Sequence, residues 1–204
     1  MPFPRDELVG FLIAVSFAAG LNVYATVATL GLLGRFDVLT LPGSLDLLTN
    51  EWIIGACGAL FLIEFVADKI PMVDLVWNAL QTFVRVPVGA LLAYGATSGL
   101  SPGAQLVATM VGGSIALAAH GGKTAARAAV TPSPEPASNF LLSVAEDAFA
   151  IFITWFATQH PYLAATIVVL LLVVIVVLVR WIVKAIRSLW RNALERRDRV
   201  AVMR

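Results

Sequence analysis

Apolar residues gather along this chain into stretches too long for the core of a small soluble domain. From residue 167 to residue 179 every side chain is aliphatic, and hydrophobic residues make up 59% of the sequence. Charged residues make up 13%, against about 25% in an average soluble domain. An apolar helix of about 20 residues is long enough to cross a lipid bilayer. The pattern therefore predicts an all-α fold, a polytopic membrane helical bundle.

Six segments have the length and hydropathy of a membrane-crossing helix. They are residues 7–34, 50–70, 73–96, 102–122, 138–158 and 161–179. Capping residues support two boundaries, because Asn50 opens the second segment and Ser101 with Pro102 opens the fourth. The third segment is the least apolar, which favours a position facing protein or water. We therefore expect a transmembrane bundle of about six spans over residues 1–179.

Basic residues are distributed unevenly between the two expected sides of the membrane. Eight of the fourteen Lys and Arg residues fall within residues 180–204. The same expected side holds Arg5, Lys69, Lys123 and Arg127. Arg35 is the only basic residue in the three loops expected on the other side. The positive-inside rule then predicts a cytoplasmic C-terminus, and an even number of spans places the N-terminus there too.

The segment after the last expected span, residues 180–204, is rich in basic residues. Its first turns carry bases and tryptophans at helical spacing: Arg180, Trp181, Lys184, Arg187, Trp190 and Arg191. Tryptophan favours the membrane interface, and clustered Lys and Arg attract anionic headgroups. We expect a basic amphipathic cytoplasmic tail that extends the sixth helix along the inner leaflet and binds anionic lipid.

The two halves of the chain share loose landmarks. Gly20 and Arg35, within and just after the first expected span, resemble Gly113 and Arg127, within and after the fourth, and further landmarks recur, such as Asn50 with Asn139 and Pro71 with Pro161. If the halves are related, two triplets of helices must have opposite orientations. That arrangement is the inverted repeat found in many transporters. Chance similarity between apolar segments is the alternative, and the sequence leaves both open.

Ionisable and polar side chains occur within the expected spans, where a charge is costly unless it is paired or hydrated. Candidates for a substrate or ion pathway are Asn22, Glu64, Asp68, Lys69, Asp74, Arg85, His120, Lys123, Arg127, Glu146 and Asp147. We expect the acids and bases among them to form one connected network inside the bundle. Ion pairs that only join helices, or that pair with lipid headgroups, are the structural alternative.

Helical spacing places several of these candidates on common faces. Glu64 and Asp68 are four residues apart, and His120, Lys123 and Arg127 follow an i, i+3, i+7 pattern. Neighbouring glycines allow close approach of a ligand or a helix to this basic face. Such a face suits a phosphate or carboxylate group. The alternative is that it neutralises acids on other helices.

Two expected spans contain signals of a helix break. Gly20, Leu21 and Asn22 interrupt the first, and Pro87 follows Arg85 in the third. A break frees backbone groups that can bind a cation, a hydroxyl or water, and transporters commonly bind substrates at such points. Ordinary kinks explain the same residues without a substrate.

Several classes of site are absent from the sequence. Cys57 is the only cysteine, so neither an internal disulfide nor a paired-cysteine site can form within one chain. His120 lacks a second nearby ligand at metal-binding spacing. The phosphate-loop, dinucleotide, zinc-protease and serine-elbow motifs are missing. We expect no enzyme activity, no metal, no cofactor and no nucleic acid partner.

With these residues in view, the chain resembles the bacterial membrane proteins grouped as the domain of unknown function 4126 family. The resemblance covers about residues 8–160 and leaves out the basic tail. Its motifs are Gly20 to Thr26, Gly31 to Arg35, Glu64 to Asp74, His120 with Lys123 and Arg127, Pro134 to Asn139, and Ser143 with Glu146 and Asp147. The resemblance implies a membrane location, in a bacterial cytoplasmic membrane, and a bundle fold. It implies no reaction.

The leading functional hypothesis is a small transporter or channel with a polar intramembrane pathway for an unidentified solute or ion. A flippase or scramblase of a phosphate-bearing lipid is a second hypothesis, based on the basic face of residues 120–127. A scaffold or assembly partner is a third and an intramembrane enzyme a fourth, and a homo-oligomer is compatible with all of them. An enclosed cavity favours the first, a wet groove open to lipid the second, and fully paired charges the third.

Overall fold

The computed structural model describes residues 4–68, 70–130 and 136–202 of the 204-residue chain. All regular secondary structure in these ranges is helical, which confirms the all-α prediction. The elements are α1 (Arg5–Leu21), α2 (Val23–Arg35), the short 3-10 helix η1 (Leu45–Thr49), α3 (Glu51–Ala67), α4 (Pro71–Ala96), α5 (Pro102–Val130), α6 (Pro136–Gln159) and α7 (Pro161–Val202).

The helix starts follow from short-range chemistry that the sequence predicts. The Asn50 side chain accepts a hydrogen bond from the Trp52 amide at 2.9 Å and so caps α3. Each of the helices α4 to α7 has proline as its first residue. Proline suits this position, because its fixed φ is helical and its missing N–H would have no partner there.

Four helical segments in the described part of the chain are long and apolar enough to cross a bilayer. They are Val76–Ala96, Pro102–Arg127, Phe140–Gln159 and Pro161–Ala185. The helices that cover the first two expected spans are shorter, with 17 residues in α1, 13 in α2 and 17 in α3. The expected count of six spans is therefore not confirmed.

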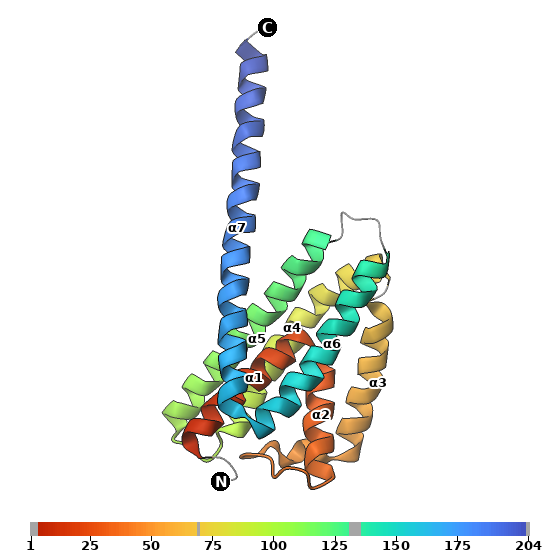
Figure 1. The fold of residues 1–204 in the computed structure, drawn as a ribbon, viewed down its shortest axis with the longest axis vertical. Helices are drawn as coiled ribbons and strands as arrows, with labels where there is room; N and C mark the ends of the chain where they lie inside the picture. The colour runs from red at the N-terminus through yellow and green to blue at the C-terminus, as the bar shows by residue number, and fades with distance from the viewer. Residues whose placement is uncertain (1–3, 69, 131–135, 203–204) are drawn as a thin grey trace.

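The segment 7–34, expected as one span, is two helices that meet at Asn22. The backbone of Asn22 is extended, with φ −149° and ψ 103°, so α1 ends at Leu21 and α2 starts at Val23. The Asn22 side chain caps α2 by accepting from the Ala25 amide at 2.9 Å. Figure 1 shows α1 rising into the bundle and α2 turning back, so that the two helices form a V with Asn22 at its apex.

Both open ends of this V lie at one end of the bundle. Near the start of α1, Gly10 packs against the backbone of Pro161, where α7 begins. In the loop after α2, the Ser44 amide donates to the Gly95 carbonyl near the end of α4 at 2.9 Å. We name this the α4–α5 end, and the opposite end, where α3 finishes and α4 starts, the α3–α4 end.

The two termini therefore lie at opposite ends of the molecule. α7 starts at the α4–α5 end and extends beyond the α3–α4 end, so the C-terminus lies on that side of the bundle. The N-terminus lies at the α4–α5 end (Figure 1). The expectation that both termini lie on the cytoplasmic side is therefore not confirmed. The break at Asn22 is the physical reason for this arrangement, because it returns the chain to the end of the bundle at which it began.

The inverted repeat is also not confirmed. The proposed correspondence equated the first expected span with the fourth, but the first is broken at Asn22, whereas α5 runs without interruption from Pro102 to Val130. Shared glycine and arginine landmarks therefore do not correspond to a shared backbone conformation.

Small residues bring the central helices into close contact. α1 lies at the centre and packs against α4, α5, α6 and α7, and its residues 14–20 are all buried. A Cβ atom added to Gly20 would come within 2.4 Å of the Ala116 carbonyl oxygen on α5. A Cβ at Gly112 would come within 2.5 Å of Ala93 on α4. Close helix contacts of this kind are typical of membrane bundles.

Replacement of Gly112 by alanine tests this packing. We expect Gly112→Ala to destabilise the bundle by about 1–3 kcal/mol, because α4 and α5 must separate to admit the methyl group. Gly121→Ala on the same helix is the matched control, since no described atom lies within 4 Å of its added Cβ. Thermal unfolding of both variants in detergent measures the difference, and equal stability of the two would contradict the packing.

Candidate functional site

The end of α1 places backbone carbonyls inside the bundle, and two basic side chains bind them. Arg85 Nη1 on α4 lies 3.4 Å from the Gly20 carbonyl oxygen, and Lys123 Nζ on α5 lies 3.3 Å from that of Leu21. A helix C-terminus carries partial negative charge and unsatisfied carbonyls. The two cations therefore satisfy a helix end that is buried away from water.

Arg85 also forms a buried ion pair with Glu64 on α3. Nη2 of Arg85 contacts Glu64 Oε1, and both side chains are fully buried. Nη1 of the same guanidinium lies 3.0 Å from His120 Nδ1. Arg85 thus joins α3, the end of α1 and α5 around one planar group, which can donate along several directions at once.

His120 is a neutral hydrogen-bond acceptor in this arrangement. A guanidinium only donates, so Nδ1 of His120 must accept from Arg85 and carries no proton. The proton therefore lies on Nε2, which donates to Thr82 Oγ1 at 2.8 Å, and Thr82 donates to the Asn78 carbonyl at 3.3 Å. His120 does not supply a positive charge here.

A second group of ion pairs links α3, α5 and α6. Arg127 Nη2 lies 2.7 Å from Asp68 Oδ2 and 2.8 Å from Glu146 Oε2. Lys123 Nζ lies 3.4 Å from the same Asp68 oxygen and 3.3 Å from the same Glu146 oxygen. The two acids and two bases alternate, so each base is shared by both acids.

Asp147 differs from the other acids, because its described partner is an amide and not a base. Asn22 Nδ2 donates to Asp147 Oδ1 at 2.8 Å. The orientation of the Asn22 amide follows from its capping role, since Oδ1 accepts the Ala25 N–H and Nδ2 is then left to donate. Among the described members of the cluster, Asp147 is the acid without an ion pair.

Three buried carboxylates keep one oxygen without a hydrogen-bond partner among the described residues. These atoms are Glu64 Oε2, Asp68 Oδ1 and Asp147 Oδ2. The three residues are 0%, 3% and 3% exposed respectively. Buried carboxylate oxygens are normally satisfied, so these atoms are available to a further group.

Most of the predicted candidates meet in this one cluster. Two groups of ion-paired side chains, and the pair of Asn22 and Asp147, lie around the end of α1. The acids and bases gather inside the bundle as expected, but among the described contacts the two ion-paired groups meet at the Gly20 and Leu21 carbonyls and not in one side-chain network. The members are Asn22, Glu64, Asp68, Arg85, His120, Lys123, Arg127, Glu146 and Asp147. Lys69 and the side chain of Asp74 lie outside the described residues. That these residues form a substrate pathway stays a prediction.

Sequence reasoning missed several polar members of the cluster. The hydroxyls of Thr82 and Ser143 bind His120 and Asp68 respectively, the latter at 3.5 Å. Gln81 donates to the Tyr24 hydroxyl at 3.1 Å. Gln81 and Thr82 could have been found as polar residues in an apolar segment, because each lies within one turn of Arg85. Ser143 stands out only as a motif residue of the family resemblance, which implied no role for it.

The described residues show no metal centre and two apolar grooves. No group of three or more described His, Cys, Asp and Glu side chains is arranged to hold a metal ion. One groove, of about 440 Å³, lies between α2, α3 and α4, with Tyr24 and Leu91 in its lining. The other, also about 440 Å³, lies between α1 and α5. Both are lined mainly by aliphatic side chains and lie outside the charged cluster.

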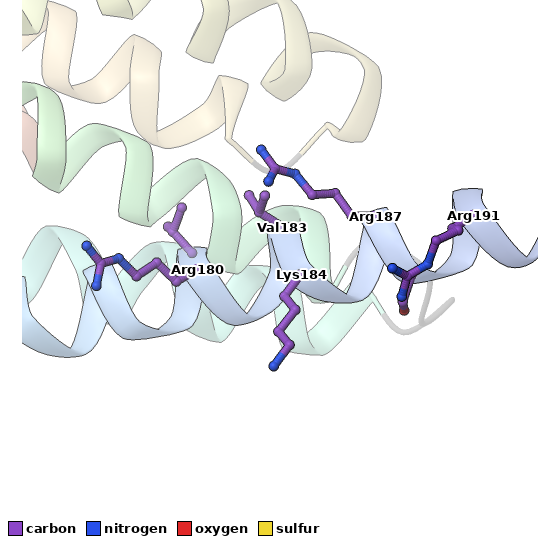
Figure 2. A pocket seen from close by; sticks show the side chains of 7 residues that line it. Arg180, Val183, Lys184, Arg187 and Arg191 are labelled. Atoms are coloured by element: carbon purple, nitrogen blue, oxygen red, sulfur yellow. The ribbon is translucent and has the colours of Figure 1, made fainter.

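The basic tail continues α7 as one helix. Figure 2 shows Arg180, Lys184, Arg187 and Arg191 along this helix, beside a hollow of about 660 Å³. All the described residues that line the hollow belong to α7, so it is an open surface. Trp181 and Trp190 are 73% and 70% exposed. Binding of this segment to anionic lipid stays a prediction.

The fold and site define an all-α bundle that is compatible with a multi-pass membrane protein and that contains a buried charge cluster at a broken helix. The family model described as domain of unknown function (DUF4126) matches residues 9–181, and the chain belongs to this family. The match extends beyond the expected limit near residue 160 and reaches the start of the tail. No curated protein and no solved structure matches the chain.

The ion pair between Glu64 and Arg85 can be tested by removal and rescue. We expect Arg85→Met to cost about 3–5 kcal/mol of stability, because it leaves a buried carboxylate without its base. Adding Glu64→Leu should recover much of the loss, since both charges are then absent. Thermal unfolding in detergent measures each variant.

A matched control is available in the exposed pair of Arg35 and Glu51, which are 3.2 Å apart and largely open to solvent. Arg35→Met should change stability little. If Arg85→Met were as stable as this control, the buried pair would not be holding α3 to α4.

Proposed function

We propose that this chain is a small membrane transporter whose pathway passes the break between α1 and α2. The observation that carries the proposal is that a helix ends inside the bundle, within a cluster of buried charges. Non-helical backbone at membrane depth is tolerated where protein or a water-filled cavity surrounds it. Broken helices of this kind commonly carry the substrate and ion sites of transporters.

The state of the acidic oxygens favours a transporter over a scaffold. A scaffold needs every buried charge paired, whereas Glu64, Asp68 and Asp147 each keep one oxygen without a described partner. Such oxygens offer sites to a proton, a cation or a donor group of a solute. Burying these oxygens without a partner is unfavourable, and a ligand that binds them during the transport cycle would remove that cost.

The pairing of the bases disfavours a flippase of a phosphate-bearing lipid. Lys123 and Arg127 already bind Asp68 and Glu146, so a phosphate would have to displace carboxylates from both. The basic face of α5 therefore fits the neutralising role better than the phosphate-binding role.

One pair of the cluster reaches the surface. The side chains of Arg127 and Glu146 are 8% and 10% exposed, whereas those of Lys123, Asp68, Glu64 and Arg85 are fully buried. We propose that solvent enters the cluster beside the Arg127 and Glu146 pair, between α5 and α6.

The distribution of charge supports a revised orientation. Residues 180–204 carry eight of the fourteen Lys and Arg residues, and α7 runs past the α3–α4 end. The start of α1 and the end of α2 lie at the α4–α5 end, which holds the N-terminus, and they carry two basic residues, Arg5 and Arg35. By the positive-inside rule we propose a cytoplasmic C-terminus and an external N-terminus.

Cysteine accessibility tests the pathway. Ser143 is fully buried beside Asp68, and Ser143→Cys is a conservative change. In a Cys57→Ala background, we expect a small membrane-impermeant thiol reagent to modify Ser143→Cys from the cytoplasmic side, because a transporter hydrates its pathway. Ser114→Cys, on the exposed face of α5, is the lipid-facing control and should stay unreactive.

Failure of Ser143→Cys to react from either side of the membrane, in a folded protein, would favour the scaffold. Equal reaction of Ser114→Cys would show instead that the reagent reaches the lipid-facing surface, and the comparison would no longer support a hydrated pathway.

Labelling of the N-terminus tests the orientation. In the same Cys57→Ala background, Pro4→Cys should be labelled by an impermeant reagent added outside intact cells, because α1 and α2 return to one side. Arg187→Cys should be labelled only after permeabilisation. If labelling required permeabilisation at both positions, both termini would be cytoplasmic. That result would contradict the V formed by α1 and α2 and would support an even number of spans.

A further inference from the structure

The charges of the buried cluster do not balance. Four acids, Glu64, Asp68, Glu146 and Asp147, face three fixed bases, Arg85, Lys123 and Arg127. His120 adds no charge, because its Nδ1 accepts from Arg85. Lys69 and Asp74, whose side chains lie outside the described residues, carry opposite charges and leave the difference unchanged. One negative charge is therefore in excess.

The excess charge falls on Asp147. Glu64 has Arg85 as its direct partner, and Asp68 and Glu146 share Lys123 and Arg127. Asp147 has only the neutral amide of Asn22, is 3% exposed, and keeps Oδ2 without a described partner. An isolated carboxylate in an apolar interior is strongly unfavourable, and protonation is the simplest way to remove its charge.

The groups around Asp147 do not replace that proton. Lys123 on α5 acts on Asp147 through charge, but it is already shared by Asp68 and Glu146. Asp68 on α3 and Glu146 on α6 repel a negative charge on Asp147, and Glu64 also interacts with it. Among the described residues, no three or more His, Cys, Asp and Glu side chains are arranged to hold a metal ion. A proton therefore fits this position better than a metal cation does.

Asn22 connects Asp147 to the helix break. Its amide accepts the Ala25 N–H with one atom and donates to Asp147 with the other, at 2.9 and 2.8 Å. A change of charge on Asp147 therefore changes the strength of a bond made by the residue that caps α2. Hydrogen bonds to a charged acceptor are about twice as strong as neutral ones.

We infer that Asp147 binds the proton that drives this transporter, and that Asn22 transmits its binding to the hinge between α1 and α2. The inference rests on the proposed function for the coupling step. In the binding step a proton from water joins Asp147 Oδ2, the carboxylate becomes a carboxylic acid, and the net charge of the cluster rises from −1 to zero. Oδ1 continues to accept from Asn22.

Infrared difference spectroscopy of the purified full-length protein tests the proton site. Raising the pH should remove one protonated-carboxyl band per chain, and ¹³C-aspartate labelling should shift that band. Asp147→Asn should abolish it, whereas Glu51→Gln, which changes an exposed acid outside the cluster and leaves the charge of the cluster unchanged, should leave it. Retention of the band in Asp147→Asn, no shift with labelled aspartate, or loss of the band on adding Na⁺ at constant pH would overturn the inference.

A reciprocal variant guards against a folding defect. Asn22→Asp combined with Asp147→Asn keeps one carboxyl, one amide and a capping side chain, so the charge of the cluster is that of the parent. We expect the band to return in this variant. A folded reciprocal variant without a titrating carboxyl would overturn the inference.

Hydrogen exchange measures the connection to the hinge. In the parent, exchange at the first turn of α2, including the Ala25 amide, should change over the pH range in which the band titrates. In Asp147→Asn it should be independent of pH over that range, and a dependence that persists would overturn the role of Asn22. If Ser143→Cys reacts with the thiol reagent but no aspartate titrates, the proposed transporter is supported and only the proton site at Asp147 is overturned.

Discussion

The burial of a helix end in an apolar bundle is the constraint on which this structure depends. α1 stops at Leu21, which is buried inside the bundle, and its last carbonyls have no partners within the helix. Arg85 and Lys123 satisfy the carbonyls of Gly20 and Leu21. Once two cations are buried, acids must be buried with them, because an unpaired charge in such a place is strongly unfavourable. The cluster of Glu64, Asp68 and their neighbours follows from that need.

The same constraint explains why so many helices of this fold carry small residues at their contacts. Because Gly20, Gly89 and Gly112 lack a Cβ atom, α1, α4 and α5 can approach one another closely. Basic side chains on α4 and α5 then reach the end of α1. In lipid, where apolar surface gains little by leaving its surroundings, close packing and polar contacts supply much of the association energy. Packing and charge are therefore two aspects of one arrangement around the break.

The break also joins stability to function. A continuous helix would satisfy its own backbone and would leave no reason for Arg85 and Lys123 to meet at its end. A hinge held by side-chain bonds can be rearranged at lower cost than one held by a continuous backbone ladder. Asn22 belongs to both systems, because it caps α2 and binds Asp147. A transporter needs an element of this kind, with two arrangements that a bound species can shift.

The sequence by itself determined the fold class, the helix starts at Asn50 and the prolines, and the gathering of charges in the interior. These features depend on local chemistry and on the cost of burying charge. Both can be read from the type and spacing of the residues. Only the tertiary structure decided that α1 and α2 turn back at Asn22, that the termini lie at opposite ends, and that Asp147 pairs with an amide. Those outcomes depend on which helices become neighbours. A stretch such as Gly20, Leu21 and Asn22 encodes a break, but its direction is set by Arg85 and Lys123, which lie more than sixty residues away in the chain.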